Sequence, residues 1–318
     1  MPRVVVLDGY TVNPGDNSWS ELEQLAELSV YERTPPNLVI ERSRGCQVVI
    51  TNKVPFDAAT LEALPELRGI CVSATGYNIV DLEAASRGGV AVCNVPAYST
   101  ASVVEHTFAL LFELCRRVGL HDRLVHEGHW ASSPDFAFWR TPQIELHGLR
   151  FGVVGYGSIG SAVARVAQAF GMVVLSTPSR QRPPESFVTT ANLDTVFEQS
   201  DVVSLHCPLT EQTRGLVDEA RLRSMKRSAF LINTSRGALV QELDLADALR
   251  DQTIAGAALD VLSQEPPPPD HPLTQLQNCI ITPHLAWTSL AARKRLLRTT
   301  VENVRGILQG KPINRVNR

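Results

Sequence analysis

The sequence has no apolar run long enough to cross a membrane. A spanning helix needs about 20 consecutive apolar residues, and the run VVVL near the amino terminus is too short even for a signal peptide. Lys and Arg form no cluster, and the formal net charge over 318 residues is only -3. The electrostatics therefore favour neither a nucleic-acid partner nor a membrane surface, and we expect a cytoplasmic protein.

The cysteines and histidines lack the spacing of metal and redox sites. No two cysteines form a CxxC pair, and no two His or Cys residues have the separation that zinc sites use. We therefore expect no metal ion, and we expect most cysteines to be small buried hydrophobic side chains. Cys207 is the exception, because it directly follows a strand-like run and is a candidate to line a pocket.

The motif GYGSIG lies between a strand-like run and a segment with the apolar period of an amphipathic helix. Gly155 permits a tight turn, Gly157 lets the backbone approach a pyrophosphate, and Gly160 lets the helix pack close to the strand. The free N–H groups at the helix start, around Ser158 and Ile159, favour a phosphate group. The motif predicts a dinucleotide-binding turn; a glycine-rich turn without a ligand is the alternative.

Strand-like runs alternate with helical ones on both sides of this motif. The earlier runs lie at residues 4–8, 47–51, 69–74 and 90–95. We expect the segments between them, such as 20–28 and 57–64, to be helical. After the motif the alternation resumes, from FGVVG to CIITP. This pattern predicts an α/β protein with two doubly wound, Rossmann-like parallel-sheet domains.

A helix expected from a cap at 99–102 to about Val118 is apolar on almost every side. Such a helix is buried on more than one face, so we expect it to pack on its own domain and on a second subunit. A wholly internal helix is the alternative. The following stretch, 121–147, is rich in aromatic residues and has no clear period. Such a stretch is usually a surface excursion, but because aromatic side chains are costly to expose, it favours an interface loop.

Polar side chains follow three of the later strands, and ligands of open α/β sheets lie beyond the carboxyl ends of strands. Arg236 follows AFLINT, and its planar fork matches a carboxylate. His284 follows the last strand, and an imidazole can exchange a proton near neutral pH with an alcohol or ketone. Glu265, shortly after Asp260, fits the role of a carboxylate that supports the imidazole. The alternatives are a solvated surface residue for Arg236 and a structural role for His284, and His206 is the nearest rival to His284.

The succession GYGSIG, HCPLTEQTRGL, INTSRGALV, ALDVLSQEPPP and TPHLAW resembles the D-isomer-specific 2-hydroxyacid dehydrogenases, most of all their glycerate dehydrogenase or hydroxypyruvate reductase branch. The run from GICVSATGYN to HTFALL is similar to the earlier half of the family, so the resemblance covers most of the chain. It implies a discontinuous substrate-binding domain, 1–100 and 288–318, with an NAD(P)-binding Rossmann domain, 101–287, inserted into it. It also implies a homodimer.

The resemblance further assigns roles to single residues. It implies that Arg236 binds the substrate carboxylate, that His284 donates and accepts the proton, and that Glu265 supports His284. The implied substrate-binding positions are the backbone of Ala74, Thr75 and Gly76, together with the side chain of Trp139. In some relatives an aromatic residue of this loop reaches toward the active site of the neighbouring subunit. The implied positions in the cofactor cleft are Cys207, Pro208, Thr213, Thr234 and Asp260, the last at the nicotinamide end.

One residue of a typical NAD site is missing. An acid about twenty residues past the glycines normally holds the ribose hydroxyls, but this chain reads MVVLSTPSRQRPP there and has no acid before Glu185. Ser179, Arg180 and Arg182 would instead bind the extra phosphate of NADP. We expect NADP(H) to be preferred over NAD(H). Equal use of both cofactors, with the arginines in a solvated loop, is the alternative.

Together these features predict an oxidoreductase that reduces a small 2-oxo acid, hydroxypyruvate or glyoxylate, to the D-2-hydroxy acid with a nicotinamide cofactor. The alternative is a dinucleotide-sensing, corepressor-like binding protein on the same scaffold, because such a protein can keep the same Arg, Glu and His. A methyltransferase with a similar glycine turn is disfavoured by the second sheet unit and by the placement of those three residues.

Overall fold

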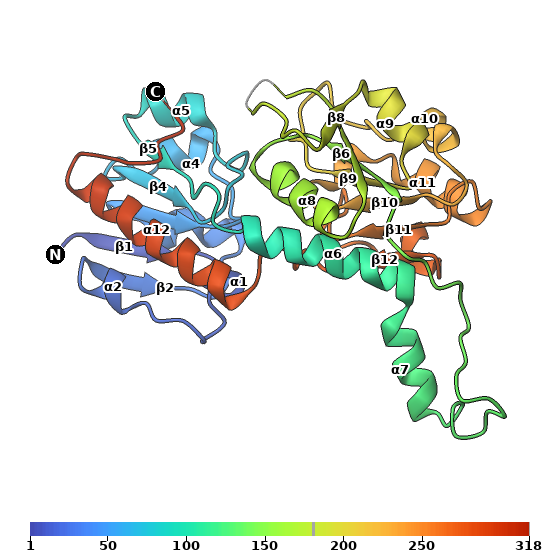
Figure 1. Ribbon diagram of the computed structural model, residues 1–318. Helices are drawn as coiled ribbons and strands as arrows, with labels where there is room; N and C mark the ends of the chain where they lie inside the picture. The colour runs from blue at the N-terminus through green and yellow to red at the C-terminus, as the bar shows by residue number, and fades with distance from the viewer. Residues whose placement is uncertain (180–181, 318) are drawn as a thin grey trace. The chain divides into compact units, whose positions relative to one another are not determined.

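The computed structural model describes residues 1–179 and 182–317. It divides the chain into two compact units: unit 1 is Met1–Ser99 with Thr288–Arg318, and unit 2 is Thr100–Trp287. Each unit has its own parallel sheet (Figure 1). Arg180, one of the predicted cofactor residues, lies outside the described residues.

Unit 1 is built on a five-stranded parallel sheet with the order β2-β1-β3-β4-β5. Its strands are β1 Arg3–Val6, β2 Glu27–Val30, β3 Val48–Thr51, β4 Gly69–Val72 and β5 Ala91–Cys93. Its helices are α1 Gly9–Val12, α2 Ser20–Glu23, the short 3-10 helix Pro36–Leu38, α3 Val39–Ser43, α4 Ala58–Glu62, α5 Leu82–Arg87 and α12 Leu290–Leu308.

The central strands of unit 1 are buried on both faces, as their continuous apolar runs predict. Successive side chains alternate between faces, so Val5 enters one core cluster and Val4 the other. The second cluster is closed by α12, the last helix of the chain. A side chain at Gly69 would lie 2.6 Å from Ile307 of α12, so the glycine lets this helix pack directly on β4.

Unit 2 is built on a seven-stranded parallel sheet with the order β12-β11-β10-β9-β6-β7-β8. Its strands are β6 Arg150–Val154, β7 Val173–Ser176, β8 Val188–Thr190, β9 Val202–Leu205, β10 Phe230–Asn233, β11 Gly256–Leu259 and β12 Cys279–Ile281. The strand order reverses between β6 and β9. In sheets of this kind, ligands bind beyond the carboxyl ends of the strands at that reversal.

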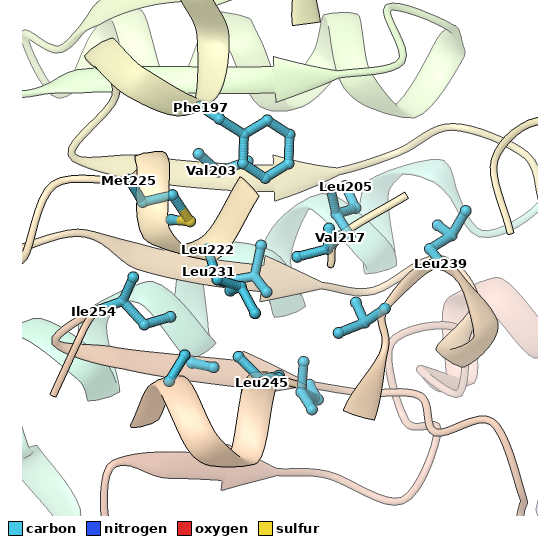
Figure 2. Packing of buried hydrophobic residues seen from close by; sticks show 14 of the residues in the cluster. Phe197, Val203, Leu205, Val217, Leu222, Met225, Leu231, Leu239, Leu245 and Ile254 are labelled. Atoms are coloured by element: carbon cyan, nitrogen blue, oxygen red, sulfur yellow. The ribbon is translucent and has the colours of Figure 1, made fainter. Parts of the chain in front are cut away.

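Helices cover both faces of the sheet in unit 2 (Figure 1). The helices of unit 2 are α6 Thr100–Arg116, α7 Val118–His126, α8 Ser158–Ala169, α9 Leu193–Gln199, α10 Glu219–Ser224 and α11 Glu242–Arg250, with short 3-10 helices at Gly237–Leu239 and Pro272–Gln275; of these, α7 stands away from the sheet (Figure 1). Figure 2 shows part of the core on one face, where Phe197, Val203 and Leu231 are fully buried. None of the described helices is long and apolar enough to cross a bilayer.

The expected fold class is confirmed, since both sheets are parallel and doubly wound. Two local expectations are wrong. Residues 20–28 are not one helix, because α2 ends at Glu23 and the edge strand β2 begins at Glu27; β2 has only four residues, too few for its alternation to stand out from the helical segment before it. Residues 121–126 are not irregular but belong to α7, which has no buried residue.

Candidate active site

The three side chains predicted to react follow three neighbouring strands of unit 2. Arg236 lies just after β10, Glu265 in the loop after β11, and His284 just after β12. These strands are parallel and adjacent in the sheet, so their carboxyl ends share one edge. The structure therefore places all three residues at the edge where ligands of such sheets bind.

His284 and Glu265 form an ion pair. The Nδ1 atom of His284 lies 2.8 Å from Oε2 of Glu265, and the two side chains are 28% and 34% exposed. Because a carboxylate only accepts, Nδ1 carries the hydrogen of this bond. The bond therefore fixes the orientation of the ring and leaves Nε2 as the nitrogen that can exchange a proton with a substrate.

The backbone at His284 adopts the left-handed conformation, with a φ of 57°. This conformation is uncommon for a residue other than glycine and costs about 1 kcal/mol or more. The N–H of His284 lies 2.9 Å from the carbonyl oxygens of both Asp260 and Thr282. These contacts, with those to the Asp260 side chain, hold the turn in place and aim the imidazole.

The carboxylate of Asp260 organises this turn. Its Oδ1 accepts the hydroxyl of Thr282 at 2.6 Å and the N–H of Leu285 at 2.7 Å, and its Oδ2 accepts the N–H of Ala286 at 2.9 Å. Burial alone would raise the pKa of Asp260, but the hydrogen bonds from His106, Thr282, Ala286 and Leu285 outweigh it and hold the pKa below its ordinary value. Asp260 is thus an ionised residue that shapes the turn bearing His284, and its predicted contact with the nicotinamide end stays a prediction.

The loop that carries Glu265 is held by Glu242, the first residue of α11. Oε1 of Glu242 accepts the N–H of Ser263 at 2.7 Å, and Oε2 lies 3.2 Å from Nε2 of His271. Within the loop, the N–H of Leu262 donates to Oε1 of Glu265 at 3.1 Å. Both ends of the loop are therefore tied to one buried carboxylate.

Arg236 is exposed, and its backbone turn is packed against the same loop. The carbonyl oxygen of Arg236 accepts a hydrogen bond from Nδ2 of Asn233 at 2.9 Å, and Nη1 donates to the carbonyl of Ser235 at 2.7 Å. A side chain at Gly237 would lie 1.9 Å from the carbonyl carbon of Leu262. Only glycine lets the turn bearing Arg236 lie directly on the loop bearing Glu265.

The glycine motif forms the turn between β6 and α8 that the sequence predicts. Gly155 has a φ of 98°, and a side chain there would lie 2.5 Å from the backbone nitrogen of Cys207. A side chain at Gly160 would lie 2.1 Å from the carbonyl of Gly155, so α8 packs tightly on the turn. At Gly157, by contrast, nothing lies within 4 Å. This open space lies at the N-terminus of α8, beside Ser158 and Ile159, and the contact of these residues with a pyrophosphate stays a prediction.

The loop after β7 has the composition that the sequence analysis singled out. Ser179 Oγ accepts the N–H of Arg182 at 3.3 Å. Glu185, the first acid after β7, is tied to the protein: it accepts the hydroxyl of Tyr156 at 3.0 Å and Nε–H of Arg165 at 2.8 Å. Burial alone would raise the pKa of Glu185, but the hydrogen bonds from Arg165 and Tyr156 outweigh this effect and hold the pKa below its ordinary value. Glu185 therefore does not take the place of the missing ribose-binding acid.

The other predicted cofactor residues lie near the end of β9 and at the end of β10. The hydroxyl of Thr213 donates to the carbonyl of Pro208 at 2.7 Å, and Thr234 Oγ1 lies 3.3 Å from Thr107 Oγ1 of α6. Cys207 is buried, its carbonyl accepts the hydroxyl of Ser235, and burial raises the pKa of its thiol to about 11. The thiol is thus protonated at neutral pH and lines the turn without reacting. Contact of these residues with a cofactor stays a prediction.

His206 is unsuited to the acid/base role for which it was the rival. Burial lowers the pKa of its imidazole to about 4, so the ring is neutral near pH 7 and cannot serve as the proton donor. Its Nε2 lies 2.8 Å from the hydroxyl of Ser204. The structural role that was the alternative for His206 is the better interpretation.

The predicted carboxylate-binding loop of unit 1 follows β4. The hydroxyl of Thr75 donates to the carbonyl of Val95 at 3.1 Å, and the carbonyl of Ala74 accepts the N–H of Val95 at 2.9 Å. These bonds hold the loop, including Gly76, beside the end of β5. Its contact with a substrate stays a prediction. So does the role of Trp139, whose side chain is 68% exposed.

Four residues of the site region were missed from the sequence: His106, Thr282, Glu242 and His271. Their partners are far away in the chain; His106 and Thr282, for example, are separated by 176 positions. No local pattern marks such a pair. Among residues 1–179 and 182–317, no group of His, Cys, Asp and Glu is arranged to hold a metal ion.

The chain is similar to known proteins over most of its length. The family profile described as "D-isomer specific 2-hydroxyacid dehydrogenase, NAD binding domain" matches residues 108–286. A hydroxypyruvate reductase of Blautia hydrogenotrophica is 45% identical over 99% of this chain and 100% of its own length, and a glycerate dehydrogenase of Methylorubrum extorquens is 40% identical over 98% of both. A crystal structure of a protein from Thermus thermophilus is similar with a TM-score of 0.87, at 35% identity over 99% of both chains.

The depressed pKa of His206 predicts how stability depends on pH. An unfolded histidine titrates near pH 6.5, whereas folded His206 stays neutral down to about pH 4. Between these two pH values, His206 binds a proton in the unfolded chain but not in the folded chain. The free energy of unfolding therefore falls as the pH is lowered through this window. Replacing His206 by Gln should remove this part of the pH dependence. Urea unfolding of both proteins from pH 8 to pH 4 measures it; a constant difference between them across the window would contradict the prediction.

Proposed function

Since this chain belongs to the D-isomer specific 2-hydroxyacid dehydrogenase family and is an oxidoreductase that uses a nicotinamide cofactor, we propose that it reduces hydroxypyruvate or glyoxylate to the D-2-hydroxy acid. The observation that carries the proposal is the ion pair between His284 and Glu265 at the strand edge that also bears Arg236. The names of its relatives, a hydroxypyruvate reductase and a glycerate dehydrogenase, support the choice of a small 2-oxo acid.

Arg236 binds the substrate carboxylate in this proposal. Its guanidinium presents two parallel N–H groups that match the two oxygens of a carboxylate, and each charge-assisted bond contributes about 1.5 to 3 kcal/mol. The side chain is exposed at the strand edge, while its turn is fixed by Asn233 and by the packing of Gly237. Arg236 therefore orients the 2-oxo acid rather than taking part in proton transfer.

His284 supplies the proton. When bound, the cofactor provides the hydride that reaches C2 of the 2-oxo acid. The Nε2–H bond of the His284 imidazolium breaks, and its proton goes to the keto oxygen, which becomes the hydroxyl of the product. Glu265, at 2.8 Å from Nδ1, stabilises the imidazolium before transfer and keeps Nε2 turned toward the substrate.

The pairing of His284 with Glu265 also bears on the corepressor-like alternative. The ring of His284 is held by one carboxylate at 2.8 Å and its backbone is held in the left-handed conformation, an arrangement that suits proton transfer. Both relatives named above are called enzymes. These observations favour the oxidoreductase.

We propose that NADP(H) is preferred over NAD(H). The turn after β7 has no free acid to repel a ribose phosphate, because Glu185 is tied to Tyr156 and Arg165. Ser179, Arg180 and Arg182 provide the hydroxyl and the positive charge that such a phosphate binds.

We propose that the protein is a homodimer joined through α7 and the loop after it. Figure 1 shows this segment standing away from the sheet of unit 2. The side chains of Trp130, Phe136 and Trp139 are 50%, 94% and 68% exposed, and α7 has no buried residue. Because each such aromatic side chain brings about 150 to 250 Å² to an interface, covering them with a second copy gives a large gain.

Replacing His284 by Ala should lower kcat for hydroxypyruvate reduction by about 100- to 10,000-fold, the usual contribution of a general acid. Loss of NADPH absorbance measures the rate. Arg223, exposed on α10, lies outside both the site and the proposed dimer interface, and its replacement by Ala is the control that should leave the rate unchanged. Full turnover in the His284→Ala protein would remove this residue from the mechanism.

The cofactor proposal predicts a kcat/KM with NADPH well above that with NADH. Replacing Arg182 by Ala should lower the NADPH value by about tenfold, since one charge-assisted bond to the phosphate is lost, and should leave the NADH value unchanged. Steady-state rates with hydroxypyruvate at saturation measure both. Equal values in the wild-type protein would support the dual-cofactor alternative instead.

The dimer proposal predicts a particle of twice the 34.8 kDa chain mass in light scattering. Replacing Phe136 and Trp139 by Ser should weaken association, whereas Ser at Leu243, an exposed leucine of α11, should not. A wild-type particle of one chain mass at micromolar concentration would refute it.

A further inference from the structure

Helix α6 contacts residues at the ends of three strands, β10, β11 and β12, which lead to the predicted reactive side chains. Nε2 of His106 lies 3.0 Å from Oγ1 of Thr282, just after β12, and 3.3 Å from Oδ1 of Asp260, just after β11. The next residue, Thr107, lies 3.3 Å from Thr234 at the end of β10. Two consecutive residues of one buried helix therefore brace the strand ends that lead to His284 and Arg236.

The protons in this cluster can be assigned from its geometry. The carboxylate of Asp260 is ionised and only accepts hydrogen bonds, so the single hydroxyl hydrogen of Thr282 points to it along the 2.6 Å contact. The oxygen of Thr282 is then left as an acceptor for His106. Nε2 of His106 must therefore carry a hydrogen, which it donates to Thr282 and, at the longer distance, to Asp260.

This N–H acts on the turn of His284 through its partners. Thr282 and Asp260 together bond the backbone of residues 284, 285 and 286. The groups that make these bonds lie directly after β11 or in the turn after β12. Within the part of the chain that the structure describes, His106 is the side chain from a different element, α6, that donates to Thr282 and Asp260.

We propose that His106 is a positioning residue for the reaction of His284. Its Nε2–H holds Thr282 and Asp260 in the arrangement that keeps the 284–286 backbone in place, and so fixes the direction in which the imidazole of His284 points. The kinetic consequence rests on the function proposed above, whereas the consequence for the backbone does not.

Two isosteric replacements separate positioning from packing. The side-chain nitrogen of Gln can occupy the place of Nε2, whereas the shorter Asn places its nitrogen near the position of Nδ1. We expect His106→Gln to keep kcat within about threefold of wild type, because the donor is kept. We expect His106→Asn to lower kcat by about 10- to 100-fold, the effect of a misdirected catalytic group, with the KM for NADPH unchanged.

A measurement that needs no turnover tests the same idea. The N–H groups of Leu285 and Ala286 are bonded to Asp260, and their hydrogen exchange reports on the turn. In His106→Asn these two amides should exchange at least about tenfold faster than in wild type. In His106→Gln they should not, and the amides of β9 should be unchanged in both proteins.

A double-mutant cycle closes the test. Thr282→Val removes the nearer of the two groups through which His106 acts, so adding His106→Asn to it should lower kcat by a smaller factor than in the wild-type protein. Additive effects of the two substitutions on kcat would overturn the proposal. So would equal losses of kcat in the His106→Gln and His106→Asn proteins, or a His106→Asn protein whose kcat and amide exchange rates match those of the wild type. If the wild-type protein reduces no 2-oxo acid, the proposed function fails, and the exchange rates still decide the role of His106.

Discussion

The active-site edge of unit 2 depends on the hydrogen bonds that surround one buried carboxylate. An ionised Asp in the interior is stable only when donors replace the water it has lost. Asp260 obtains them from a hydroxyl, two backbone N–H groups and a nearby imidazole. These donors belong to different elements, so satisfying one charge ties β11, the turn after β12 and α6 together. The conformation of His284 is a by-product of this requirement.

The parts of the site that rest on local pattern could be predicted from the sequence. The glycine turn follows from the spacing of Gly155, Gly157 and Gly160 after a strand, and the structure has the strand, turn and helix in that order. Arg236 and His284 could be placed because parallel strands bring their carboxyl ends to one edge. The lack of an acid directly after β7 is likewise a local feature of the sequence. The structure adds that Glu185, the next acid, is already hydrogen-bonded to Tyr156 and Arg165.

The parts that rest on distant contacts could not be predicted. The edge strand β2 has only four residues and α7 only nine, and both are largely exposed, so their short patterns do not stand out from the neighbouring segments. The two ends of the Glu265 loop meet at Glu242 because of packing between strands, not because of a pattern in the sequence. The same is true of His106, which in the sequence is one histidine within a mostly apolar helix.

The close packing at Gly237 has a consequence for redesign of the substrate pocket. Because Gly237 has no side chain, the backbone next to Arg236 lies in direct contact with the backbone of Leu262, in the loop that carries Glu265. A change in the position of either backbone therefore presses on the other. Remodelling residues 235 to 238 would also disturb the loop that holds Glu265 against His284. Acceptance of bulkier 2-oxo acids is better sought in segments that lie outside this shared scaffold.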